Sequence, residues 1–112
     1  MEPKIVRFAK ETAPAGHHGT ILAGPVLPEG MRSPFSHAWG YLENEAAMEG
    51  HAHPEEEIYM VVRGEGFVHM YGKRYPVKAG DVVEIPVNTY HTMSCEAGHA
   101  LQWAALWWPA EG

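Results

Sequence analysis

The sequence predicts a single all-β domain, a sandwich or barrel of short strands. Its apolar residues fall into short runs rich in β-branched and aromatic side chains, and proline and glycine separate these runs at short intervals. No stretch has the apolar periodicity of an amphipathic helix of several turns, and only ENEAAME, residues 43–49, could hold one helical turn. The 112 residues are the size of one domain.

The runs of β-forming residues give the expected strands in chain order. They are residues 4–8, 20–22, 36–42, 58–63, 66–71, 74–77, 81–85, 91–95 and 100–107. Glycine-bearing turns are expected at RGEG (63–66), YGKR (71–74) and KAGD (78–81). The segment 24–34 is expected to be a loop or an irregular edge, because its prolines cannot donate to a sheet ladder.

Composition narrows the possible partners. The net charge of −6 argues against nonspecific nucleic-acid binding, which needs a basic face. Cys95 is the single cysteine, so no intrachain disulfide is possible. The N-terminus lacks a signal-peptide stretch, and no apolar run approaches the roughly 20 residues that span a bilayer. We therefore expect a cytoplasmic protein that binds neither nucleic acid nor membrane.

The segment GHAHPEEEIYMVVRGEG, residues 50–66, could hold metal ligands. His51 and His53 are two residues apart, so both side chains share one face of an extended segment. Glu57 keeps the same parity, whereas Glu56 points to the other face. Glu55 has the right parity but follows a proline, where the path should bend. The alternative is a polar loop that precedes a strand.

A fourth ligand must come from another segment, and GDVVEIPVNTYH, residues 80–91, offers His91. Three imidazoles and one carboxylate suit a divalent transition metal, Mn, Fe, Co, Ni, Cu or Zn, better than magnesium or calcium. Four protein ligands leave open positions in an octahedral shell, as catalysis at a metal requires. The alternative is a set of structural histidines in a metal-free barrel.

These two segments resemble the two motifs of the cupin superfamily. In the first motif, His-x-His is followed by a glutamate and then a glycine, and His51, His53, Glu57 and Gly64 match in residue and spacing. In the second motif, Gly80, Pro86 and His91 match. The departures are Glu45 and Asn88 where the family has glycine, and Cys95 where it has asparagine. None of these three is a metal ligand in the family.

The resemblance implies a double-stranded β-helix, a jelly-roll barrel of the RmlC-like type, with a divalent metal inside it. It implies His51, His53, Glu57 and His91 as ligands to one metal ion per chain. It also implies one cupin domain over 1–112, with N-terminal strands and a loop in 1–35 and the conserved barrel in 36–108. Small cupins are commonly homodimers, and we expect a dimer that buries part of LQWAALWWP, residues 101–109.

Tyr59 and His69 are the candidate catalytic residues. Tyr59 follows Glu57 at the same parity, so it should face the metal and could donate a proton, or it could simply fill the barrel. His69 could be a partner of the metal ligands or a proton carrier if its face lines the pocket, and otherwise is a hydrogen-bonded strand histidine.

Other residues carry weaker signals. Cys95 could be a reactive thiol, but free cysteine is usually a small buried hydrophobe. Met93 is expected to line the pocket. His17 and His18 are adjacent, so they should not chelate together and are expected to be solvated loop residues.

The expected function is that of a small metal-binding cupin, an enzyme acting on a small polar organic molecule. Oxygen-dependent cleavage, isomerisation and decarboxylation or lyase chemistry are all compatible with the ligand set. The alternative is a non-catalytic binding module that recognises a sugar or an organic acid through the same metal.

Overall fold

The computed structural model describes residues 1–111, and these contain strands but no helix. The strands are β1 (Ala15–Gly16), β2 (Ile21–Leu22), β3 (Ser36–Glu43), β4 (Glu55–Met70), β5 (Lys73–Lys78), β6 (Val82–Ile85), β7 (His91–Ser94) and β8 (Ala100–Pro109). The all-β prediction is confirmed. Within the described range there is therefore no helix long and apolar enough to cross a membrane.

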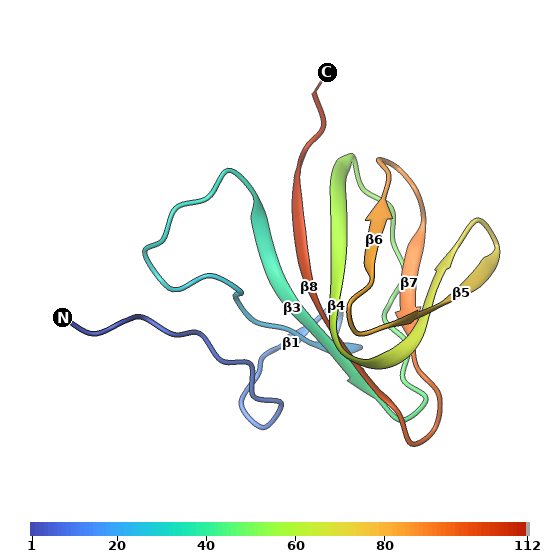
Figure 1. Cartoon of the computed structure of the whole chain (residues 1–112). Helices are drawn as coiled ribbons and strands as arrows, with labels where there is room; N and C mark the ends of the chain where they lie inside the picture. The colour runs from blue at the N-terminus through green and yellow to red at the C-terminus, as the bar shows by residue number, and fades with distance from the viewer. Residues whose placement is uncertain (112) are drawn as a thin grey trace.

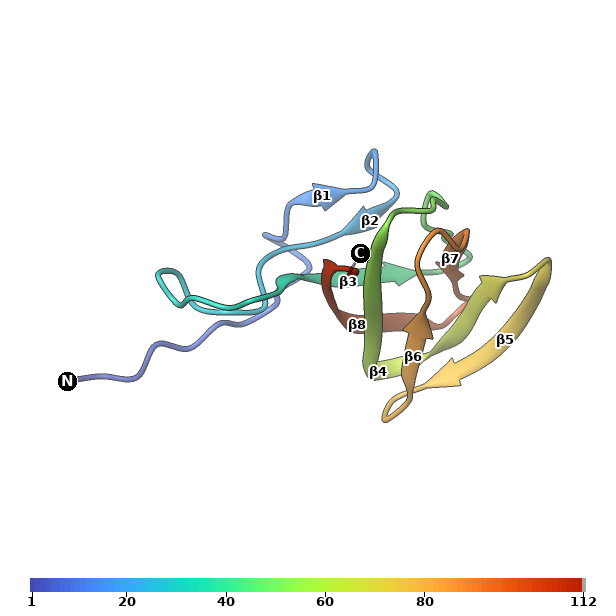
Figure 2. The same cartoon turned by 90° about the horizontal axis from the view of Figure 1, so that it is seen from above.

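Two local expectations fail. Residues 4–8 form no strand, and the N-terminal segment extends away from the sheets in both views (Figures 1 and 2). Phe8 packs back onto the first sheet, with its ring centroid 5.4 Å from that of Tyr41. Residues 43–49 hold a turn at Asn44 and Glu45 rather than a helical turn, and both have positive φ.

The strands form two antiparallel sheets that share β4. The first sheet runs β1-β2-β3-β8-β4, with β6 on the other edge of β4. In the second sheet, the later part of β4 pairs with β5 on one side and β7 on the other. Figure 2 shows the strands closing into a barrel-like ring. This arrangement is the jelly roll that the resemblance implies.

A glycine bend in β4 joins the two sheets. The prediction of two strands separated by a turn at 63–66 is wrong, because β4 is continuous from Glu55 to Met70. Its register against β8 shifts between Val61 and Arg63, as in a β-bulge, and Gly64 follows with φ 78°. A side chain at Gly64 would overlap the carbonyl of Ala100, so only glycine allows the two strands to approach this closely.

The bend reverses the parity of β4. Before the bend, the buried side chains are Glu57, Tyr59 and Val61; after it, Val68 and Met70 are buried. Large apolar side chains fill the barrel interior: Trp103, Ile85, Met93 and Leu101 are all at most 1% exposed. Packed interiors of this kind hold strand positions closely, so the interior-facing residues near one end of the barrel are well placed to form a site.

Candidate metal centre

Backbone hydrogen bonds bring the four predicted ligands together. His51 and His91 exchange two backbone hydrogen bonds, of 3.2 and 3.0 Å. The carbonyl of His53 accepts a bond of 2.7 Å from the N–H of Asn88. Asn88 takes the place of the family's glycine and adopts φ 54°, so the turn before His91 is retained. Glu57 comes from the first part of β4. Two segments far apart in the sequence thus form one cluster.

The ligand atoms of the cluster converge. One donor atom from each of His51, His53, Glu57 and His91 lies within 4.8 Å of all the others. Glu57 Oε1 is 3.0 Å from His53 Nε2 and 3.3 Å from His91 Nε2. Glu57 is 6% exposed and His91 is fully buried. The carboxylate therefore sits at the centre of the group and not at its rim.

The three imidazoles share one orientation. In each ring Nδ1 faces a backbone carbonyl: His91 to Thr89 at 2.9 Å, His53 to Glu55 at 3.2 Å, and His51 to Glu49 at 3.5 Å. A carbonyl can only accept, so each Nδ1 must carry the proton. This tautomer leaves Nε2 available to a metal ion, as metal-binding imidazoles require, although His53 Nε2 also lies 3.0 Å from Glu57 Oε1.

A second, independent observation also supports a metal ion at these residues. Nε2 of His91 is buried without a hydrogen-bond partner among the described residues, because its approach to Glu57 lacks hydrogen-bond geometry. A buried polar atom without a partner costs about 1–3 kcal/mol. A cation between the four donors would satisfy this nitrogen together with the Glu57 carboxylate.

Burial sets the protonation of the neighbouring groups. It lowers the pKa of His51, with a smaller contribution from the His91 imidazole, so His51 is neutral near pH 7. Burial, followed by the charge of Glu57, raises the pKa of Tyr59 well above its usual value. Tyr59 is 2% exposed and its ring lies 5.7 Å from that of His91. Its hydroxyl therefore keeps its proton beside the cluster.

Comparison with known proteins identifies the fold and the motifs. A family model described as a cupin domain matches residues 39–109. The chain belongs to the cupin family. No curated protein matches the sequence at a significant level.

Solved structures similar to this cupin share its fold. A Cupin 2 conserved barrel domain protein from Salinispora arenicola superposes with a TM-score of 0.85 at 24% identity, over 98% of this chain and 92% of that one. A predicted oxalate decarboxylase from Thermotoga maritima gives 0.71 at 28% identity, over 80% and 81%. The polyketide cyclase RemF from Streptomyces resistomycificus gives 0.73 at 13% identity, over 92% and 78%.

The cluster opens onto a cavity of about 230 Å³ at one end of the cupin barrel. His51, His53 and Glu57 line it, together with Tyr59. Its walls are mostly apolar: Ile21, Ala23, Ala38, Trp39, Ala105, Trp103 and Trp107. No lysine or arginine lines the cavity; besides the cluster and Tyr59, its lining residues with polar side-chain groups are His17, Glu55 and Trp39, whose indole Nε1 is buried without a hydrogen-bond partner among the described residues.

His69 does not reach this cavity. The bend in β4 turns its side chain to the outer face, where Nε2 lies 2.6 Å from Ser94 Oγ. It lines a separate surface hollow with Tyr71 and Arg74. The sequence left two alternatives for His69, a side chain that faces the pocket or a hydrogen-bonded strand histidine, and its contact with Ser94 corresponds to the second.

The weaker candidates have structural surroundings. Cys95 is 5% exposed, its Sγ donates to the carbonyl of His99, and burial raises its pKa, so it is an unreactive thiol. Met93 is fully buried in the core and does not line the cavity. Nδ1 of His37, which gave no signal in the sequence, accepts a bond of 2.9 Å from the backbone N–H of Val26.

Sequence reasoning missed His17. It is an exposed turn residue, as expected, but its ring centroid also lies 4.6 Å from that of His51 and it lines the cavity. Burial, followed by the His51 imidazole, lowers the pKa of His17. No pattern in AGHHGT signals this position, because it depends on where the β1-β2 hairpin packs.

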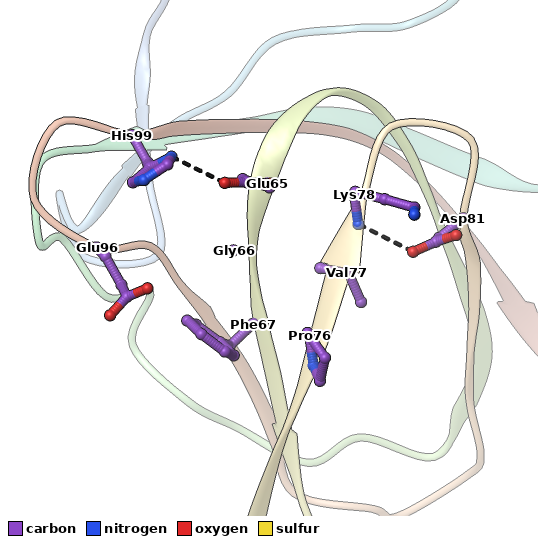
Figure 3. A pocket seen from close by; sticks show the side chains of 9 residues that line it. All are labelled: Glu65, Gly66, Phe67, Pro76, Val77, Lys78, Asp81, Glu96 and His99. Carbon is purple, nitrogen blue, oxygen red and sulfur yellow. Dashed lines mark hydrogen bonds and ion pairs between the residues drawn. The ribbon is translucent and has the colours of Figure 1, made fainter.

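A second hollow, of about 320 Å³, lies away from the cluster (Figure 3). Phe67, Pro76 and Val77 line its apolar part. Two contacts link polar residues of its lining: His99 Nδ1 lies 3.2 Å from Glu65 Oε1, and Asp81 accepts from the backbone N–H of Lys78 at 2.9 Å. None of the four predicted ligands lines it, so it is not part of the candidate metal centre.

Proposed function

We propose that this cupin is a metal-dependent enzyme that acts on a small organic molecule bound through its oxygen atoms. The observation that carries the proposal is the convergence of one nitrogen from each of three imidazoles and a Glu57 carboxylate oxygen, all within 4.8 Å of one another, beside a cavity. A divalent transition metal bound there would polarise a substrate oxygen or provide a site for dioxygen.

The cavity supports a small substrate. Its volume of about 230 Å³ lies below the range of about 300–1,000 Å³ that is usual for drug-sized ligands. Its walls carry tryptophan, isoleucine and alanine and no fixed cation. A phosphorylated or highly charged substrate would find no lysine or arginine there. We therefore favour a molecule with one oxygen-bearing end, directed to the cluster, and a compact apolar remainder.

Tyr59 is the candidate proton donor. It lines the cavity, and its raised pKa keeps the phenol protonated beside Glu57. His69 is on the outer face and has no part in the proposed chemistry. Oxygen-dependent cleavage and decarboxylation can proceed with a metal and one such donor, whereas isomerisation and elimination also need a base that removes a proton from carbon. The names of two similar structures, a predicted decarboxylase and a cyclase, lend support to carbon–carbon bond chemistry.

A non-catalytic binding module is the second candidate. The observation in its favour is the small number of titratable groups at the cavity besides the cluster itself. A module of this kind would use the same metal to hold a sugar or an organic acid in the cavity without converting it.

We expect about one metal ion per chain after purification without chelator or after loading with Mn, Fe, Co, Ni, Cu or Zn. Elemental analysis measures the stoichiometry, and the unfolding midpoint should rise with metal and fall again with EDTA. The loaded protein is then assayed for oxygen uptake and product formation on a panel of small acids, keto compounds and sugars. Metal content that stays near zero would contradict the proposal, and saturable binding without turnover would favour the binding module.

We also propose that the cupin is a homodimer. Trp103 is 1% exposed and Trp107 lines the cavity, so these two residues of the expected dimer segment 101–109 face the barrel interior. The outer face of the first sheet instead presents Ile58 beside Leu106, which pairs with it in register, and Val82, which is 63% exposed. An apolar sheet face of this kind usually marks an interface.

Light scattering at micromolar concentration is expected to give twice the chain mass of 12.4 kDa. Val82→Glu, which places a charge on the exposed part of this face, should shift the mass toward that of one chain. Val87→Glu, at another exposed valine outside the strands, is the control. A wild-type mass of one chain would refute the dimer.

A further inference from the structure

We propose that His17 is a further ligand-contact residue, whose imidazole N–H donates a hydrogen bond to the molecule bound on the open side of the metal. The inference rests on the proposed metal centre and adds to it a protein contact from outside both sequence motifs. His17 belongs to the turn between β1 and β2, far in sequence from the four candidate ligands.

The turn holds His17 in an unusual conformation. His17, His18 and Gly19 have φ values of 48°, 57° and 81°, all in the left-handed region. Non-glycine residues seldom adopt this region, and such residues persist where surrounding contacts hold them, often at functional sites. Here the N–H of Gly19 donates to the carbonyl of Gly16 at 3.0 Å, and the hydroxyl of Thr20 donates to the carbonyl of His17 at 2.7 Å.

Two further bonds tie the turn to the segment that carries the metal ligands. The backbone N–H of Glu49 donates to Thr20 Oγ1 at 2.8 Å, and the Glu49 carboxylate lies 2.6 Å from His18 Nδ1. The carbonyl of Glu49 is also the group that faces Nδ1 of His51. The hairpin and the segment around His51 are therefore linked through one residue, and the position of His17 over the cavity is built into the fold.

The geometry favours a contact to a bound molecule over a fifth metal ligand. The group of converging donor atoms comprises four residues and does not include His17. Its ring lies 4.6 Å from that of His51, centroid to centroid, and the residue is exposed. With no lysine or arginine lining the cavity, an imidazole N–H at this place is a suitable donor to an oxygen or nitrogen atom projecting from the metal.

The adjacent histidine provides a matched control. His17→Asn and His18→Asn each remove one imidazole and keep a residue that tolerates positive φ, so the turn should survive in both. His18 differs in its contacts: its ring pairs with Glu49, it does not line the cavity, and its side chain is mostly exposed. Circular dichroism and the unfolding midpoint of both metal-free variants check that the turn is intact.

The test uses cobalt-loaded protein and azide as the probe. Cobalt stoichiometry and affinity are measured first, and azide binding is then followed by the visible absorption of Co²⁺. We expect both variants to bind cobalt as the wild type does. The dissociation constant of azide should rise about five-fold for His17→Asn, as for the loss of one hydrogen bond, and stay unchanged for His18→Asn.

Three results would overturn the inference, and they are distinguishable. Equal azide affinity in His17→Asn and wild type would show that His17 does not contact the ligand. Loss of cobalt affinity in His17→Asn, or an altered cobalt spectrum before azide is added, would show that His17 acts on the metal or on His51. A wild-type protein that does not bind cobalt or any other transition metal would remove the proposed function as well.

Discussion

Replacement of Glu57 by glutamine is expected to reduce transition-metal affinity by about 100-fold or more, beyond the effect typical of residues that only orient metal ligands. Glu57 Oε1 lies 3.0 and 3.3 Å from the Nε2 atoms of His53 and His91 and is the one anionic donor of the group. Glutamine keeps the shape of the side chain but removes the charge that offsets a divalent cation. Isothermal titration with Mn²⁺ and Co²⁺ measures the change.

Glu56→Gln is the matched control for this experiment. Glu56 precedes Glu57 on β4 but points outward, where its Oε2 accepts a bond of 3.0 Å from Trp108 Nε1. It loses the same charge at nearly the same place in the chain, so a general electrostatic effect would appear in both variants. Metal affinity near the wild-type value in Glu57→Gln would show that the cluster is not the metal site.

Gly64→Ala is expected to destabilise the fold by about 3 kcal/mol or more, in the range of the most damaging single substitutions. The residue has φ 78°, and an added Cβ would overlap the carbonyl oxygen of Ala100 on β8. The Cβ would be fixed to the backbone of β4 and would meet backbone atoms of Ala100, so neither strand can move aside without opening the pairing of β4 with β8. Urea unfolding followed by tryptophan fluorescence measures the loss.

Gly72→Ala separates the two causes of this loss of stability, the strain of a positive φ and the overlap with the facing strand. Gly72 has nearly the same φ, 73°, but an added Cβ there would meet nothing within 4 Å. The Gly72→Ala substitution should therefore lower the free energy of unfolding only by the strain of a positive φ, about 1 kcal/mol. Equal losses in the two variants would mean that the close approach of β4 to β8 does not depend on glycine, and the account of the bend would have to be abandoned.

The sequence predicted much of the fold because its strands carry strong local signals. Alternation and β-forming side chains placed most strands to within a few residues, and parity over the short stretch from His51 to Glu57 selected residues that the structure brings together. His91 was added by the family motif, since its distance in sequence gives no local signal.

The failures have one physical origin, which is that local patterns do not report tertiary contacts. A glycine in a left-handed conformation can reverse the chain in a turn or bend a continuous strand, and the sequence RGEG is compatible with both. The orientation of the His69 side chain depends on whether residues 63–66 form a turn or a bend. The position of His17 depends on the packing of a short hairpin against Glu49. Whether residues 4–8 form a strand depends on whether another strand lies where it can pair with them.

The division of the ligands between two segments has a consequence for how the protein opens. His51, His53 and Glu57 precede the bend in β4, whereas His91 begins β7, and the chain between them includes β5 and β6. A bound ion would close this stretch into a loop, as a covalent cross-link does. The protection of β5, β6 and β7 against amide exchange would then rise and fall with metal occupancy.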